Sequence, residues 1–166
     1  MLKALLLADL HGEYGMIESF MELGPDIVFI AGDITNMGTA KDVDTCFSRI
    51  DVPSFSVPGN CDPKEVIEAL EQSNSVNLHG STMNLGKISL VGIGGSNPTP
   101  FSTPFELTDK QIDDLLKIPV SRMDKATHHV LISHAPPLGI LDEIGWNHVG
   151  SASVKKYLDH FDLVCC

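Results

Sequence analysis

Four short stretches of this sequence combine carboxylate, imidazole and carboxamide side chains, the groups that bind borderline and hard divalent ions. Each stretch follows an apolar run, and they are Asp9-Leu10-His11-Gly12, Gly32-Asp33, Gly59-Asn60-Cys61-Asp62 and His134-Ala135-Pro136-Pro137. Alternation along an extended segment places the side chains of Asp9 and His11 on the same side. A carboxylate on a second strand, Asp33, could bridge two ions about 3.5–4 Å apart. The pattern therefore indicates a metal centre.

The elements that must position these residues alternate between apolar, strand-like runs and amphipathic, helix-like segments. We expect strands over Leu2–Ala8, Asp26–Ala31, Ser54–Val57, Lys87–Ile93, His129–Ser133 and Asp162–Cys166. We expect helices over about Tyr14–Leu23, Ala40–Ile50, Pro63–Glu71, Leu107–Leu116 and Ser151–His160, the last three capped by Asp62, Thr108 and Ser151. This alternation predicts one α/β domain over residues 1–166, with helices covering a largely parallel sheet.

In such a fold, ligands bind outside the carboxyl ends of the strands. We therefore expect the polar residues at these ends to converge on one site, namely Asp9, His11, Asp33, Asn60 and His134. Each of them has a simpler explanation alone, since an aspartate after a strand often caps a helix and an asparagine suits a turn. Ligand types at the ends of four strands are much harder to explain by coincidence, and the metal site is favoured.

The composition restricts the classes of protein further. The chain has 166 residues, a hydrophobic fraction of 43% and no apolar run near the roughly 20 residues of a membrane span. A net charge of −11 argues against duplex nucleic acid as a partner and suits a protein that gathers carboxylates around cations. Since no apolar run is long enough to span a bilayer, no membrane is expected as a partner. Four cysteines without a C-x-x-C pair or a disulfide framework favour a reducing, cytoplasmic setting.

Taken in order, these motifs resemble the signature of the calcineurin-like metallophosphoesterases, which is Asp-x-His, Gly-Asp, Gly-Asn-His-Asp/Glu, a strand-end His and Gly-His-x-His. The stretches "DLH", "GD", "GNCD" and "SHAPP" correspond to the first four, and the resemblance covers essentially the whole chain. The longer stretches "VPGNCDP", "GIGGSNPTPFSTPFE", "SHAPPLG" and "HVGS" look like a prokaryotic phosphodiesterase-like branch. The resemblance implies a layered αββα sandwich, an α/β fold of two sheets between layers of helices.

The resemblance also implies a reaction and a role for each residue of the site. Asp9 and His11 would hold a first metal ion, and Asp33 would bridge it to a second. Asn60 and His134 would complete the second site, so that the metal ligands are also the catalytic residues. A metal-bound hydroxide would attack the phosphorus of a small phosphate ester, preferably a phosphodiester. The two divalent ions would be manganese, iron, zinc or a mixed pair.

Three features depart from the family pattern or leave it open. Cys61 replaces a histidine thought to assist the leaving group, and a thiol with an ordinary pKa near 8.5 suits that task poorly. His148 could substitute for it, or could shape its own loop. The sequence stops at Cys166, directly before the expected Gly-His-x-His. We therefore expect a fold lacking its C-terminal strands, with weak metal retention, low activity and an exposed strand edge that favours homo-oligomers.

Two alternative functions belong to other classes. The absence of the two late histidines suits a catalytically inactive binding scaffold, for which the retromer subunit with this fold looks like a precedent, whereas the five upstream ligands oppose it. A nucleotide-binding domain is disfavoured because no G-x-G-x-x-G or GxxxxGK[ST] motif follows the first strand. The loop Gly94–Phe105, with three prolines and two phenylalanines, could form a pocket wall or packed surface.

Overall fold

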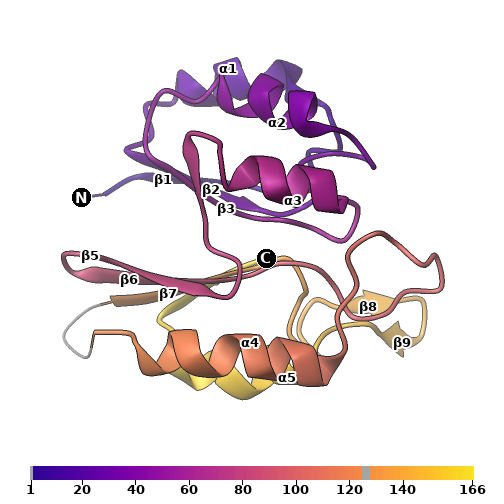
Figure 1. Cartoon of the computed structure of the whole chain (residues 1–166). Coiled ribbons are helices and arrows are strands. Elements are labelled where there is room, and N and C mark those ends of the chain that lie inside the picture. The colour runs from indigo at the N-terminus through magenta and orange to yellow at the C-terminus, as the bar shows by residue number, and fades with distance from the viewer. Residues whose placement is uncertain (1, 125–127) are drawn as a thin grey trace.

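Two four-stranded sheets lie face to face, and a layer of helices covers the outer face of each (Figure 1). The arrangement is that of a computed structural model, which describes residues 2–124 and 128–166. The first sheet is parallel throughout, in the order β1 (Ala4–Leu7), β2 (Ile27–Ala31), β3 (Ser54–Val57) and β4 (Ser75–Asn77). The second has the order β10 (Leu163–Cys165), β7 (His128–Ser133), β6 (Ile88–Ile93) and β5 (Ser81–Leu85), in which β5 is antiparallel to β6.

The helices form the two outer layers of the predicted αββα sandwich, and the fold class is confirmed. Helices α1 (Ile17–Met21), α2 (Ala40–Phe47) and α3 (Lys64–Leu70) lie over the first sheet, and α4 (Asp109–Ser121) and α5 (Ala152–Tyr157) over the second (Figure 1). Two 3₁₀ turns, η1 (Tyr14–Met16) and η2 (Leu158–His160), adjoin α1 and α5. A small hairpin of β8 (Glu143–Ile144) and β9 (Asn147–His148) stands apart from both sheets. Within the described ranges, no helix has the length and apolar character needed to cross a bilayer.

The apolar core follows the layers, because successive residues of a strand point to opposite faces of its sheet. In β2, Val28 and Ile30 pack against the first helix layer, whereas Ile27 and Phe29 pack between the two sheets. Ile132 of β7 belongs to the same inter-sheet cluster as Phe29. This packing holds β2 and β7 close together, so their carboxyl ends reach the same rim of the molecule.

Most predicted elements are present within a few residues of their expected bounds, and two helix starts are confirmed by their caps. The hydroxyl of Thr108 accepts the amide of Gln111 at 3.3 Å, in a capping box. The hydroxyl of Ser151 accepts the amide of Val154 at 3.1 Å. The start of a helix is thus readable from residues that are close in sequence.

Helix ends and edge strands differ from the prediction. Helix α4 continues beyond Leu116 to Ser121, because Ile112, Leu116 and Pro119 share a buried face whose packing outweighs the proline. The expected helix Tyr14–Leu23 begins instead as the 3₁₀ turn η1. Strands β4 and β5 were not expected, because their polar, half-exposed sequences become strands through pairing at the sheet edges.

Candidate metal centre

The carboxyl ends of several strands meet at one rim, where backbone hydrogen bonds tie the loops together. After β1, the amide of Asp9 donates to the first carbonyl beyond β2 at 3.1 Å, and the amide of His11 donates to the carbonyl of Asp33 at 2.9 Å. After β7, the amide of His134 donates to the last carbonyl of β6 at 3.0 Å. The loops that carry the predicted ligands therefore continue the hydrogen bonding of the sheets, which fixes where their side chains begin.

Asp33 is buried at the centre of this rim and faces a histidine on either side. Its Oδ2 lies 3.6 Å from Nε2 of His11, and its Oδ1 lies 3.5 Å from Nε2 of His134. Both distances exceed the 2.7–3.2 Å or so of an ordinary N–H···O hydrogen bond. The amide of Cys61 donates to Oδ1 at 2.8 Å and holds the carboxylate in place. The side chain thus presents one oxygen to each of two imidazoles, an arrangement that fits a bridging ligand.

His134 has one ring nitrogen committed to the backbone. Nδ1 lies 2.9 Å from the carbonyl oxygen of Ala31, and because a carbonyl can only accept, Nδ1 carries the proton. In the neutral form of the ring this leaves the lone pair on Nε2, which lies 2.8 Å from Oδ1 of Asn60. Together with Oδ1 of Asp33, three acceptor atoms gather around one point. Such a donor set fits a divalent cation, with the carbonyl orienting the imidazole from behind.

Three of the predicted ligands have strained backbone conformations. Asp9, His11 and Asp33 have φ angles of +52°, +47° and +48°, in the left-handed region that residues other than glycine rarely adopt. Each such residue costs on the order of 1–3 kcal/mol and persists only where the surrounding structure enforces it. Strain at three neighbouring residues is typical of a functional site, because it sets side-chain direction at the expense of stability.

Two glycines let the strand ends approach one another closely. A Cβ at Gly59 would lie 2.0 Å from Oδ1 of Asp33, and a Cβ at Gly32 would lie 2.4 Å from Nδ1 of His134. Neither position has room for a side chain. The glycines that precede Asn60 and Asp33 are therefore required for the rim to close, as their place beside the predicted ligands indicated.

All five predicted ligands meet here, and Cys61 lies with them. Asp9, Asp33 and His134 offer ligand atoms within 4.8 Å of one another, and so do His11, Asp33 and Cys61. Asp33 is common to both groups, as a bridging residue would be. The first group places Asp9 with His134, whereas the family resemblance assigned Asp9 to the ion held by His11. The part of these side chains in metal binding stays a prediction.

Cys61 has an environment that disfavours its ionised form. Burial, a hydrogen bond to Asp33 and the negative charge of nearby carboxylates raise the pKa of the thiol to about 12. A group with so high a pKa suits general acid catalysis less well than an imidazole does, because it transfers its proton less readily near neutral pH. The raised pKa therefore agrees with the sequence-based expectation that a thiol at position 61 is a poor general acid.

The predicted capping role of Asp62 is wrong. Helix α3 has Pro63 at its N-cap and no side-chain hydrogen bond there. The buried carboxylate of Asp62 accepts instead from the amides of Ile34 (3.1 Å), Thr35 (2.8 Å) and Gly59 (2.8 Å), and from the hydroxyl of Thr35 (2.9 Å). Burial raises the pKa of Asp62, and these hydrogen bonds offset part of the rise. Asp62 thus joins the loops after β2 and β3, which no local sequence signal distinguishes from a cap.

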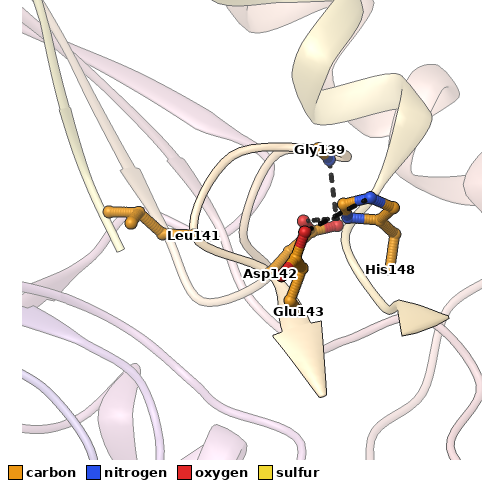
Figure 2. A pocket seen from close by; sticks show the side chains of 5 residues that line it. All are labelled: Gly139, Leu141, Asp142, Glu143 and His148. Atoms are coloured by element: carbon orange, nitrogen blue, oxygen red, sulfur yellow. Dashed lines mark hydrogen bonds and ion pairs between the residues drawn. The ribbon is translucent and has the colours of Figure 1, made fainter. Parts of the chain in front are cut away.

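His148 lies in another pocket, where its partner is Asp142 (Figure 2). Nδ1 of His148 is 2.7 Å from Oδ1 of Asp142, whose Oδ2 accepts the amides of Gly139 (3.0 Å) and Gly150 (2.9 Å). Burial would raise the pKa of Asp142, but these hydrogen bonds and the imidazole lower it to about 2. Nε2 of His148 lies 3.8 Å from the carboxylate of Glu143. His148 therefore shapes its loop, the second of the two roles that the sequence left open.

A cavity of about 450 Å³ opens beside Asn60 and His134. Its other walls come from residues 96–101 after β6, from Ala135 and Pro136, and from the β8–β9 hairpin. The loop Gly94–Phe105 therefore forms a pocket wall, the first of its two expected roles. Neither the cavity nor the hairpin was predicted: the cavity depends on segments that are distant in sequence, and the strands of the hairpin are only two residues long.

Comparison with known proteins places this geometry in context. The sequence matches the profile of the family described as Calcineurin-like phosphoesterase over residues 2–166. An uncharacterized protein of Methanocaldococcus jannaschii is 34% identical over 168 residues, an alignment that covers 97% of this chain and 75% of that protein. A crystal structure is similar with a TM-score of 0.76 and 19% identity, over 99% of this chain and 83% of the other. At this identity the structural likeness shows the fold alone.

Proposed function

The chain belongs to the calcineurin-like phosphoesterase family, which implies metal-dependent phosphoester hydrolysis, and we propose that it hydrolyses phosphodiesters at a centre of two divalent ions. The position of Asp33 carries this proposal. A buried carboxylate with one oxygen toward each of two imidazoles, at 3.5 and 3.6 Å, leaves space for a cation on either side. Strain at Asp33 and its neighbours supports a functional role over a structural one.

We assign the ligands as the sequence predicted them. Asp9, His11, Asp33, Asn60 and His134 would hold the ions, with Asp33 between them. When bound, the ions would activate water and neutralise charge on the phosphoryl oxygens. The chain itself supplies the positioning: the Cys61 amide fixes Asp33, and the Ala31 carbonyl orients His134. In the reaction, a water oxygen forms the new bond to phosphorus, the bond to the leaving alcohol breaks, and the alcohol takes up a proton.

The donor set and the overall charge restrict the ions and partners. Two imidazoles, two carboxylates and a carboxamide suit manganese, iron, zinc or a mixed pair. The net charge of −11 supports a small phosphate ester as substrate over duplex nucleic acid. All four cysteines are free thiols, which supports a cytoplasmic setting.

A preference for diesters is supported by the cavity beside Asn60 and His134. Within residues 2–124 and 128–166, no lysine or arginine lines it. A monoester carries up to two negative charges, whereas a diester carries one and replaces a charged oxygen with a second ester group. That second group can occupy the cavity, whose mostly apolar lining offers it contacts that a monoester would leave unused.

Turnover of paired substrates tests the proposal. Protein loaded with Mn²⁺ or Zn²⁺ is assayed with bis(p-nitrophenyl) phosphate and p-nitrophenyl phosphate, with bound metal measured by mass spectrometry. We expect hydrolysis that chelation abolishes, with the higher kcat/KM for the diester. The variant Ile118→Ala, an exposed apolar residue of α4, serves as the matched control and should behave as wild type. Full metal content without turnover of either ester would contradict the proposal and favour the binding scaffold.

A further inference from the structure

We propose that the cavity beside the metal centre binds an uncharged, apolar or aromatic ester group of the substrate and discriminates against substrates whose second group is anionic. The inference rests on the proposed function, because it names the substrate class of the same site. The cavity shares Asn60 and His134 with that site, so a phosphoryl group held there would direct one ester substituent into it.

The chemistry of the lining carries the first step. The apolar side chains are those of Pro98, Pro100, Phe101, Ala135, Pro136, Ile144 and Val149. The remaining lining residues, His134 apart, are neutral amides and hydroxyls, those of Asn60, Ser96, Asn97, Thr99 and Asn147. Among the residues that the structure describes, no lysine, arginine, aspartate or glutamate lines the cavity. An anionic substituent would therefore lose favourable hydration without gaining a counterion from the lining. An apolar substituent has no such favourable hydration to lose.

Three apolar side chains that line the cavity are exposed to solvent when no substrate is bound. Phe101 is 82% exposed, Ile144 69% and Val149 44%, although all three line the same space. Phe101 belongs to one wall and the other two residues to the opposite one. A ring or alkyl group placed between them would remove apolar surface from water on both sides, which is the main driving force for binding such a group.

The wall that carries Phe101 is held in place by a carboxylate. Oε1 of Glu106 accepts the hydroxyl of Thr99 at 2.6 Å and both the amide and the hydroxyl of Thr103 at 2.8 Å. The amide of Phe105 donates to the carbonyl of Asn60 at 3.0 Å, which links this wall to the metal centre. The wall is therefore positioned before the substrate arrives, which reduces the entropic cost of binding.

A second carboxylate holds the opposite wall. Asp142 accepts the amides of Gly139 and Gly150 and pairs with His148, as Figure 2 shows for the Gly139 and His148 contacts. The amide of Val149 donates to the carbonyl of Asp142 at 3.0 Å. Both walls are thus fixed from outside the cavity, since neither Glu106 nor Asp142 is among the described residues that line it.

Three diesters that share one leaving group test the inference. Each is a p-nitrophenyl ester, and the second ester group is phenyl, methyl or 2-carboxyethyl, so the bond broken is the same in all three. For the zinc-loaded protein we expect kcat/KM to be at least ~10-fold higher for phenyl than for methyl, and lowest for 2-carboxyethyl. Equal kcat/KM for phenyl and 2-carboxyethyl would overturn the inference.

Two variants separate the cavity from the metal centre. Phe101→Ala should reduce the phenyl-over-methyl ratio of kcat/KM several-fold, because it removes apolar surface from one wall of the cavity. Val149→Lys places a cation at the wall and should reverse the order of the phenyl and 2-carboxyethyl esters. The control Ile118→Ala should preserve all ratios. Ratios unmoved by both cavity variants would overturn the inference even if the protein is an active phosphodiesterase.

A binding measurement keeps the inference distinct from the proposed function. Diphenyl phosphate and dimethyl phosphate are titrated into zinc-loaded protein while the methyl resonances of Ile144 and Val149 are followed by NMR. We expect diphenyl phosphate to shift both resonances, and dimethyl phosphate to shift them far less. Shifts without turnover of any ester would contradict the proposed function and retain the cavity's specificity. Turnover of the esters with no resonance shift from diphenyl phosphate would support the proposed function and overturn the specificity inferred for the cavity.

Discussion

Asp33 and Asp142 are both buried aspartates beside histidines, yet their surroundings differ in one essential way. Asp142 is fully hydrogen-bonded: it pairs with His148 at 2.7 Å and accepts hydrogen bonds from two backbone amides. Asp33 stands 3.5 and 3.6 Å from two imidazoles and bonds neither. A carboxylate that hydrogen-bonds its neighbours holds a loop together. A carboxylate that lies beyond hydrogen-bond distance of its neighbouring imidazoles leaves room for a ligand between them. Proximity of aspartate to histidine alone does not separate these roles.

The largest expected effect comes from removing the charge of Asp33. Asp33→Asn keeps the size of the side chain but offers one neutral oxygen where two charged ones stood. We expect loss of at least one bound ion and a fall in kcat of about 10³-fold or more, comparable to removing a key electrostatic contact to the transition state. Asp142→Asn is the matched substitution. It should retain full metal content and lower kcat/KM only a few-fold, by loosening the cavity wall. Equal losses in the two variants would remove the distinction between them.

Asp62 provides the next test. It is a third buried aspartate, and like Asp142 its carboxylate accepts hydrogen bonds at both oxygens. Asp62→Ala would leave the amides of Ile34, Thr35 and Gly59 without their acceptor. We expect a loss of about 3–5 kcal/mol in the free energy of unfolding, measured by urea denaturation. Asp33→Asn should cost much less, since Asp33 accepts fewer hydrogen bonds and its neighbours are held by other contacts. A stability loss at Asp33 as large as that at Asp62 would mark Asp33 as structural.

The two carboxylates that hold the cavity walls should make the free energy of unfolding depend on pH. Hydrogen bonds from Thr99 and Thr103 lower the pKa of Glu106 from 4.5 to about 2, and the pKa of Asp142 is also lowered to about 2. A lowered pKa means that the unfolded chain binds protons first, so the contribution is complete above about pH 4.5 and is lost as pH falls toward 2. Glu106→Gln should therefore flatten the decline in unfolding free energy between pH 5 and 2.5. A decline identical to that of wild type would show that Glu106 does not hold the wall.

The smallest effect is expected at Cys61. Its backbone amide holds Asp33, but that contact does not depend on the thiol. We therefore expect Cys61→Ala to lower turnover of an aryl diester less than ~10-fold. A general acid typically contributes about 10²–10⁴-fold. A loss within that range would give the thiol a catalytic part and place it with Asp33 among the groups that act on the substrate.

The sequence predicted the rim better than the cavity, and the physical reason lies in the range of the signals. Asp9, Asp33 and His134 stand within two residues of the ends of β1, β2 and β7, and the packing of such α/β strands brings their carboxyl ends together whatever the loops do. Asp62 looked like a helix cap because its true partners, Ile34 and Thr35, lie some 28 residues away in sequence. Each cavity wall is held by hydrogen bonds between residues three to eight positions apart. The cavity itself forms only where residues 96–101, 134–136 and 144–149 meet, and no periodicity or spacing in the sequence indicates that meeting.

The strain at the rim was also beyond sequence reasoning. Left-handed conformations are expected at glycine, yet Asp9 and His11 adopt them beside Gly12, which the sequence marks as the flexible position. The conformation is imposed by the hydrogen bonds of the rim, which exist only in the folded chain. The residues that meet at the rim were therefore readable from the sequence, while their grouping around Asp33 required the structure.

Anomalous diffraction from crystals of the zinc-loaded protein tests the central claim most directly, since it locates the ions without reference to activity. We expect two zinc peaks on either side of Asp33, each about 2.0–2.2 Å from a carboxylate oxygen of Asp33, with His11 and His134 as nitrogen ligands on opposite sides. The pocket of Asp142 and His148 should hold none. A zinc ion between Asp142 and His148, or no peak within bonding distance of Asp33, would contradict the account.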